Sequence, residues 1–339
     1  MKCRMILVTV SAFILTVGGF VFLGAGVALA ASNEKVVIKY SHVQSPTSPT
    51  GLAAEFLKKY LEEKSSGRIT MEIFPSGQLY NDNTEIDALI SGNVDLLSTY
   101  MGKMTGLDPS LQFCLAPFIF DSPEQMLAFY GDEGNKAVVY KKIAAQDIEV
   151  LSVFFAGSQY FMSNAKKITS PEDLKGMKVR EGGGRMIAAL YSAVGASVTT
   201  VAYSDLYTAM QTKLVDAVVT SIDGAVAIKL QETIKFVSLF DHILAPYVMM
   251  VNRTKFNSYD EETQTIITDG LKAAQAFQLE KIYELTKKGM DEMKTSCEFY
   301  QPTQEEKDAF KKVWNPIVAE FVDSDVSSAI ERFKASWKN

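Results

Sequence analysis

Hydrophobic positions along the chain follow two spacings that alternate from about residue 36 onward. Short runs of β-branched and aromatic residues predict strands, and apolar residues three and four positions apart predict helices. In the first region the predicted strands are 36–40, 69–74 and 94–99, and the predicted helices are 51–64 and 81–92, the latter capped by Asn81 or Asp82. Strands alternating with helices predict an α/β fold with a parallel sheet.

A second region with the same alternation begins near Val150. It contains the helix-start string Ser170-Pro171-Glu172-Asp173, and Ser204 is the expected cap of a later helix. The predicted strands are 150–155, 159–163, 177–180, 198–201, 215–220 and 248–251, followed by long helices over 261–293 and a last helical stretch opened by Thr303. No Pro- or Ser-rich linker separates the two regions, so we expect segments that cross between them.

The first thirty residues have the composition of an export signal. Lys2 and Arg4 precede an apolar stretch over residues 5–29, which ends in Ala28-Leu29-Ala30 before polar residues. This pattern predicts a signal peptide over 1–30 that is cleaved after a small residue. A transmembrane anchor is the alternative, because the stretch is long enough to span a bilayer. The interrupting glycines and the small-residue end favour cleavage and a periplasmic protein.

Composition excludes several classes of function. Lys and Arg number 34 against 40 Asp and Glu, for a net charge of −6, and no basic run is present to bind nucleic acid. His42 and His242 are the only histidines, too few for a three-histidine zinc site, and we predict no metal or cofactor. Cys114 and Cys297 either pair in an oxidising compartment or remain two buried thiols, and the sequence leaves both open.

Arg180 is the strongest candidate for ligand binding. It ends a predicted strand, just before Gly182-Gly183-Gly184 and the start of a helix. A guanidinium binds a carboxylate through two parallel hydrogen bonds, and a helix start favours an anion. The competing interpretation is an ion pair with a nearby acid such as Glu181.

The strand ends of the first region add further candidates. Ligands of parallel sheets bind beyond the carboxyl ends of the strands, where His42, Tyr100 and Lys103 fall. A single histidine there is more often structural than functional. No Gly-x-Ser-x-Gly nucleophile motif occurs in the sequence, so nucleophilic catalysis has little support.

Several strings occur in the order typical of one family. They are 67–79, ending in Phe-Pro-Ser-Gly-Gln-Leu, then 92–96, 170–180 with Pro-Glu-Asp-Leu-Lys-Gly-Met-Lys-Val-Arg, 203–211 and 215–217. In these strings the chain resembles the extracytoplasmic solute-binding proteins of tripartite ATP-independent periplasmic (TRAP) transporters, the DctP-like family. The resemblance extends over essentially all of the mature chain.

The resemblance implies a two-lobed periplasmic-binding-protein fold with hinge-crossing strands and a long C-terminal helix region. One lobe is expected to comprise 31–156 and about 245–285, and the other 157–244 and about 286–339. It further implies that the lobes close around a small organic acid and deliver it to TRAP membrane permease subunits. Under this interpretation the protein is not an enzyme, and we expect a monomer.

The family's ligand contacts carry over residue by residue. Arg180 matches the arginine that binds the ligand carboxylate, and Tyr203 matches an aromatic residue placed against the ligand. Thr220 falls where a polar residue, often Asn, contacts the ligand. Tyr100 and Lys103 fall on the loop of the first lobe that faces it.

One position departs from the family pattern. Many members carry a second arginine where this chain has Gln159. The resemblance therefore implies a monocarboxylate ligand, unless Arg185 or Lys103 supplies the second charge. A periplasmic sensor that presents the ligand to a receptor, and an exported hydrolase or isomerase, are the alternative functions.

Overall fold

The structure is a computed structural model that describes residues 34–337. The signal peptide predicted over 1–30 lies outside these residues. Among the helices described, none combines the length and the apolar composition needed to cross a membrane.

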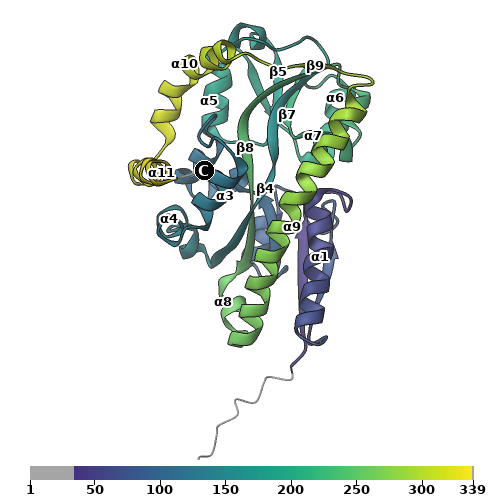
Figure 1. The fold of residues 1–339 in the computed structure, drawn as a ribbon, viewed down its shortest axis with the longest axis vertical. Helices are drawn as coiled ribbons and strands as arrows, with labels where there is room; N and C mark the ends of the chain where they lie inside the picture. The colour runs from purple at the N-terminus through teal and green to yellow at the C-terminus, as the bar shows by residue number, and fades with distance from the viewer. Residues whose placement is uncertain (1–33, 338–339) are drawn as a thin grey trace, which may run out of the picture. The chain divides into compact units, whose positions relative to one another are not determined.

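The described chain forms one mixed sheet of nine strands with helices packed against it (Figure 1). The strand order is β2-β1-β3-β8-β4-β7-β5-β6, and β9 pairs with β8. The strands are β1 Val36–His42, β2 Ile69–Phe74, β3 Leu96–Tyr100, β4 Ile148–Ser163, β5 Lys178–Glu181, β6 Ser197–Thr200, β7 Ala217–Thr220, β8 Phe236–Asn252 and β9 Glu298–Tyr300. The strands of the two predicted regions therefore lie toward opposite ends of the sheet.

The helices agree in general with the predicted pattern. They are α1 Pro49–Lys64, α2 Glu85–Ile90, α3 Pro123–Gly131, α4 Glu133–Val139, α5 Arg185–Ala193, α6 Leu206–Gln211, α7 Ile222–Ala227, α8 Arg253–Asn257, α9 Glu261–Met293, α10 Gln304–Phe321 and α11 Ser324–Ser336. The short 3-10 helices η1 Met101–Gly106 and η2 Pro109–Leu115 follow β3. The predicted helix over 261–293 is confirmed.

Parallel pairing is confirmed in both regions. Strand β1 runs parallel to β2 and β3, and β5 runs parallel to β6 and β7. Parallel strands need a crossover between them, which the helices provide. The carboxyl ends of these strands therefore meet at common edges of the sheet.

Two long strands join the two regions, and the sequence pattern predicted only parts of them. The predicted strands 150–155 and 159–163 form one strand, β4, with a register shift between Phe155 and Ser158. The predicted strand 248–251 is only the end of β8, which pairs antiparallel with both β3 and β4. The start of β8 was missed because Asp241 and His242 interrupt its apolar run. Figure 1 shows β4 and β8 side by side.

Two predicted helix caps are wrong. The helix expected to start at Asn81 or Asp82 begins at Glu85 after Thr84, since the preceding residues form a turn in which the Asn81 side chain accepts from the Asn83 amide. Ser204 lies in a short 3-10 turn, and Asp205 occupies the N-cap position of α6 without a side-chain capping bond. A turn that uses its polar side chains locally moves the helix start toward the C-terminus.

The long helix α9 lies beside α1 (Figure 1), and a glycine permits the close approach. A Cβ atom added at Gly270 would lie 2.9 Å from side-chain carbons of both Leu57 and Tyr60 on α1. Any larger residue at this position would therefore push the two helices apart. This contact holds α9 against the first-region end of the sheet.

His242 predicts an acid-sensitive core. Its ring stacks on Phe161 at a centroid distance of 4.5 Å, and burial lowers its pKa from 6.5 to about 3. The unfolded chain binds a proton below pH 6.5 that the folded chain rejects, so stability falls as pH drops. We expect His242→Phe to remove about 2 kcal/mol of the stability lost between pH 7 and pH 5. Urea unfolding at both pH values measures this, and an identical pH dependence in wild type and variant would contradict it.

Candidate ligand-binding site

A cavity lies where the carboxyl ends of the parallel strands meet β4 and β8. Its empty space is about 720 Å³, including the side open to solvent. Six of the eight residues predicted from the sequence line it: Tyr100, Lys103, Gln159, Arg180, Tyr203 and Thr220.

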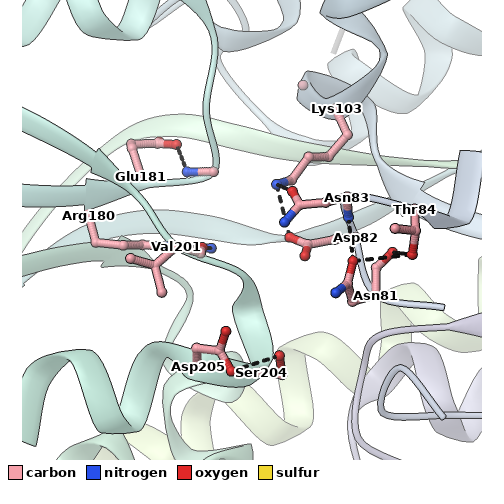
Figure 2. Close-up of polar contacts among 12 residues, drawn as sticks. Asn81, Asp82, Asn83, Thr84, Lys103, Arg180, Glu181, Val201, Ser204 and Asp205 are labelled. Atoms are coloured by element: carbon pink, nitrogen blue, oxygen red, sulfur yellow. Dashed lines mark hydrogen bonds and ion pairs between the residues drawn. The ribbon is translucent and has the colours of Figure 1, made fainter.

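The Arg180 side chain is oriented by hydrogen bonds to a backbone carbonyl. It lies in β5 and is 6% exposed, and its Nε and Nη2 donate to the Val201 carbonyl oxygen at 3.0 and 2.8 Å (Figure 2). In the described part of the chain no hydrogen bond uses Nη1. The guanidinium is therefore oriented, and part of it is left to bind an anion.

Glu181, the alternative partner considered for Arg180, points elsewhere. Its Oε2 accepts from the Gly182 amide, and residues 34–337 contain no ion pair between Glu181 and Arg180 (Figure 2). Burial raises the pKa of Glu181 to about 7, although Arg180 lowers it. Burial lowers the pKa of Arg180 while Glu181 and Asp82 raise it, so the cation stays charged. The two residues influence each other's charge without a direct contact.

Lys103 reaches the cavity from η1. Its Nζ forms an ion pair with Asp82 at 3.0 Å and donates to Asn83 Oδ1 at 3.2 Å (Figure 2). Asp82 lines the cavity and is 8% exposed. The charge of Lys103 is therefore already matched by a buried acid. The sequence pattern predicted Asp82 only as a helix cap, because nothing near it in sequence indicates a cavity.

Tyr203 and Thr220 form part of the wall toward α7. The Tyr203 hydroxyl donates to the Gly224 carbonyl at 2.9 Å, and burial raises the pKa of Tyr203. Thr220 ends β7 and is buried at the cavity. Asp223 lies beside them and was missed, since its position two residues into a short helix gives no recognisable signal.

Gln159 lines the cavity from β4. Its Nε2 donates to the Gly157 carbonyl at 3.3 Å. Gly157 has a φ of +96°, and a Cβ there would lie 2.5 Å from Ser221 Cβ, so only glycine fits. The sequence did not predict the lining residues Tyr247 and Gln44, which hydrogen-bond to each other at 2.7 Å.

His42 and Arg185 lie outside the cavity lining. His42 is fully buried at the end of β1, and burial lowers its pKa to about 4, so it is uncharged at neutral pH. Arg185 is exposed at the first residue of α5. The structure therefore does not bring Arg185 to the side chains around Arg180.

The two cysteines that the sequence left open as a possible pair are separate in the structure. Cys114 and Cys297 are both buried free thiols. Within residues 34–337, no group of three or more His, Cys, Asp or Glu side chains is placed to hold a metal ion. The cavity thus combines one oriented guanidinium, buried acids and phenols, which equips it to hold a small charged molecule.

Fold and site together define the class of extracytoplasmic solute-binding proteins. Residues 40–325 match DctP, bacterial extracellular solute-binding protein family 7, and the chain belongs to this family. The chain is 27% identical to the C4-dicarboxylate-binding periplasmic protein DctP of Rhodobacter capsulatus, covering 94% of this chain and 96% of that protein. It is 23% identical to the C4-dicarboxylate-binding protein DctB of Bacillus subtilis, covering 85% and 83%.

Solved structures share the fold. A TRAP periplasmic solute-binding protein of Sulfurospirillum deleyianum with bound succinate has a TM-score of 0.82 at 24% identity, covering 90% of this chain and all of that chain. One from Anaerococcus prevotii with bound glucuronate has a TM-score of 0.84 at 20% identity, with the same coverage. The two-lobed α/β fold is therefore confirmed. Family members are solute-binding proteins and not enzymes, and the sensor and hydrolase alternatives gain no support.

Proposed function

We propose that this protein captures a small monocarboxylate in the periplasm and delivers it to a TRAP-type membrane permease. Arg180 is the proposed anchor of the carboxylate, with Tyr100, Lys103, Gln159, Tyr203 and Thr220 around the rest of the ligand. The observation that carries this proposal is the buried Arg180 guanidinium, held by the Val201 carbonyl and leaving Nη1 without a protein partner at the cavity. A carboxylate is the natural partner for such a group.

The preference for a single carboxylate rests on the charges that remain available. Gln159 occupies the position of a second family arginine, and Arg185 is exposed outside the cavity lining. Lys103 is already paired with Asp82. A second ligand carboxylate would therefore be buried without a free cation, which costs several kcal/mol.

We further propose that the ligand is enclosed by movement of two lobes, 31–156 with about 245–285 and 157–244 with about 286–339. The cavity lining draws on both, since Asp82 and Lys103 come from the first and Arg180 and Tyr203 from the second. Strands β4 and β8 run through the proposed boundaries. Closure would bring the two sets of side chains around the acid and exclude water. We propose that the protein acts as a monomer after removal of its signal peptide.

A thermal-shift screen of the mature protein tests the function. The panel contains monocarboxylates, dicarboxylates such as succinate, sugar acids such as glucuronate, neutral sugars and inorganic phosphate. A ligand of the folded state adds about 2.7 kcal/mol of stability at a hundred times its Kd, which raises Tm by several degrees. Shifts confined to monocarboxylates support the proposal. Stronger shifts with dicarboxylates overturn the single-carboxylate preference, and shifts only with sugars or phosphate overturn the role of Arg180.

Gln159→Ala is expected to weaken binding of a monocarboxylate hit by about 1–2 kcal/mol. Gln159 offers the ligand one neutral hydrogen bond, which is worth less than a charged one. Isothermal titration of wild type and variant with the same acid measures the difference. Equal losses in Gln159→Ala and Arg180→Ala would make Gln159 a principal anchor and contradict this assignment.

A further inference from the structure

The cavity contains more unpartnered hydrogen-bond acceptors than a simple carboxylate can use. Asp82 Oδ1, Asp223 Oδ1 and Gln278 Oε1 belong to lining residues, are inaccessible to solvent and have no hydrogen-bond partner. Gln278 is oriented by its Nε2, which donates to the Phe155 carbonyl at 2.6 Å. Buried acceptors are nearly always hydrogen-bonded in proteins. A ligand with hydrogen-bond donors would therefore provide partners for these acceptor atoms.

The charges of the lining residues also favour a ligand with hydrogen-bond donors. Two cations, Arg180 and Lys103, face three acids, Asp82, Glu181 and Asp223. Lys103 is paired with Asp82, and Glu181 is the charge that acts most strongly on Arg180. Asp223 is the acid left without a cation among the lining residues. A ligand group that carries positive charge would balance it.

Arg180 and Asp223 lie at different parts of the cavity. Both influence the Tyr203 phenol, since Asp223 raises its pKa and Arg180 lowers it. Arg180 lies on β5, and β7 separates β5 from β4 in the sheet. A Cβ atom at Gly157 would lie 3.1 Å from Asp223 Oδ1, which places this carboxylate next to the backbone of β4. The cation and the unbalanced acid are thus separated within one cavity.

We propose that the ligand is an amino-carboxylate zwitterion, with its carboxylate on Arg180 and its ammonium group on Asp223. This inference rests on the proposed function and narrows its substrate class. An ammonium brings hydrogen-bond donors and one positive charge, which match the orphaned Oδ1 and the unbalanced negative charge of Asp223. A hydroxyl brings one donor and no charge, and a second carboxylate brings only acceptors.

Titration of the wild-type mature protein with matched acids tests this proposal. One set is propionate, lactate and alanine, and the other is butyrate, 4-hydroxybutyrate and 4-aminobutyrate. The expected result is that within at least one set the amino member binds most tightly. If in both sets the plain or hydroxyl member binds at least as tightly as the amino member, or if no amino member binds, the proposal is overturned.

The variant Asp223→Asn removes the negative charge of this side chain but nearly keeps its shape, so it tests the charge alone. Loss of a charged hydrogen bond is expected to weaken the amino member roughly tenfold to a hundredfold, while the plain acid changes little. Asp205→Asn is the matched control, because Asp205 is exposed and does not line the cavity. Thermal unfolding without ligand shows whether each variant folds. Equal weakening of plain and amino members by Asp223→Asn would contradict an ammonium contact.

The outcomes also distinguish this inference from the proposed function. Tight binding of succinate or glucuronate without binding of amino members overturns the zwitterion, while the role of Arg180 in binding an acid stands. Binding of plain monocarboxylates alone overturns the zwitterion and supports the proposed function. Failure of every carboxylate in the panel overturns both.

Discussion

Arg180→Ala is expected to reduce ligand affinity more than a hundredfold. The variant leaves the ligand carboxylate buried without its cation, and such a loss costs about 3–5 kcal/mol. Arg180 is 6% exposed and oriented by the Val201 carbonyl, so water cannot readily replace the guanidinium. Isothermal titration with an acid that binds the wild type measures the loss.

Two further variants make this prediction specific. Arg185→Ala is the matched control, because it removes an exposed arginine five residues away and should leave affinity unchanged. Arg180→Lys keeps the charge but loses the planar fork, so we expect an intermediate loss. Near-normal affinity in Arg180→Ala, or an equal loss in Arg185→Ala, would show that the carboxylate binds elsewhere.

Trp314→Ala is expected to destabilise the protein by about 3–5 kcal/mol, the range for truncating a buried tryptophan. Trp314 is 1% exposed, its Nε1 donates to the Leu190 carbonyl at 3.0 Å, and its ring lies 4.7 Å from that of Phe310. The variant therefore creates a cavity and leaves a buried carbonyl without its donor. Urea unfolding followed by circular dichroism measures the change in free energy.

Trp337 provides the matched control for this experiment. It is partly exposed at the end of α11, where it stacks on Phe333. Trp337→Ala should cost much less than Trp314→Ala, since water reaches the side chain in the folded state. Comparable losses from the two variants would show that burial of Trp314 is not what stabilises the region between α5 and α10.

Local sequence patterns predicted the elements that are stabilised by residues close together in the sequence. The apolar spacing that predicted a helix over 261–293 acts within a few turns, and so does the capping box in which Thr303 and Glu306 bond each other's backbone. The full length of β8 depends on pairing with β3, β4 and β9, which are distant in sequence. Register among distant strands has no local signal, so the pattern predicted only its end.

The residues of the candidate site also divide into those that the sequence identified and those that only tertiary packing brings to the cavity. Arg180 was found because it ends a predicted strand just before a glycine turn and a helix start, and a family string then marked the same residue. Asp223 and Gln278 were missed, because only the packing of α7 and α9 against β4 brings them to the cavity. Arg185 was also predicted as a cation for the ligand, but at the start of α5 its side chain is exposed. The sequence gives the charge of each side chain. Whether that side chain faces the cavity or the solvent depends on the tertiary fold.

The distribution of aromatic residues has a spectroscopic consequence. Three tyrosines, Tyr100, Tyr203 and Tyr247, line the cavity, whereas neither Trp314 nor Trp337 does. Ligand entry will therefore perturb the ultraviolet absorption of tyrosine, while tryptophan emission will report mainly on unfolding of the core. One sample can thus yield two independent optical signals, one for occupancy and one for integrity of the fold.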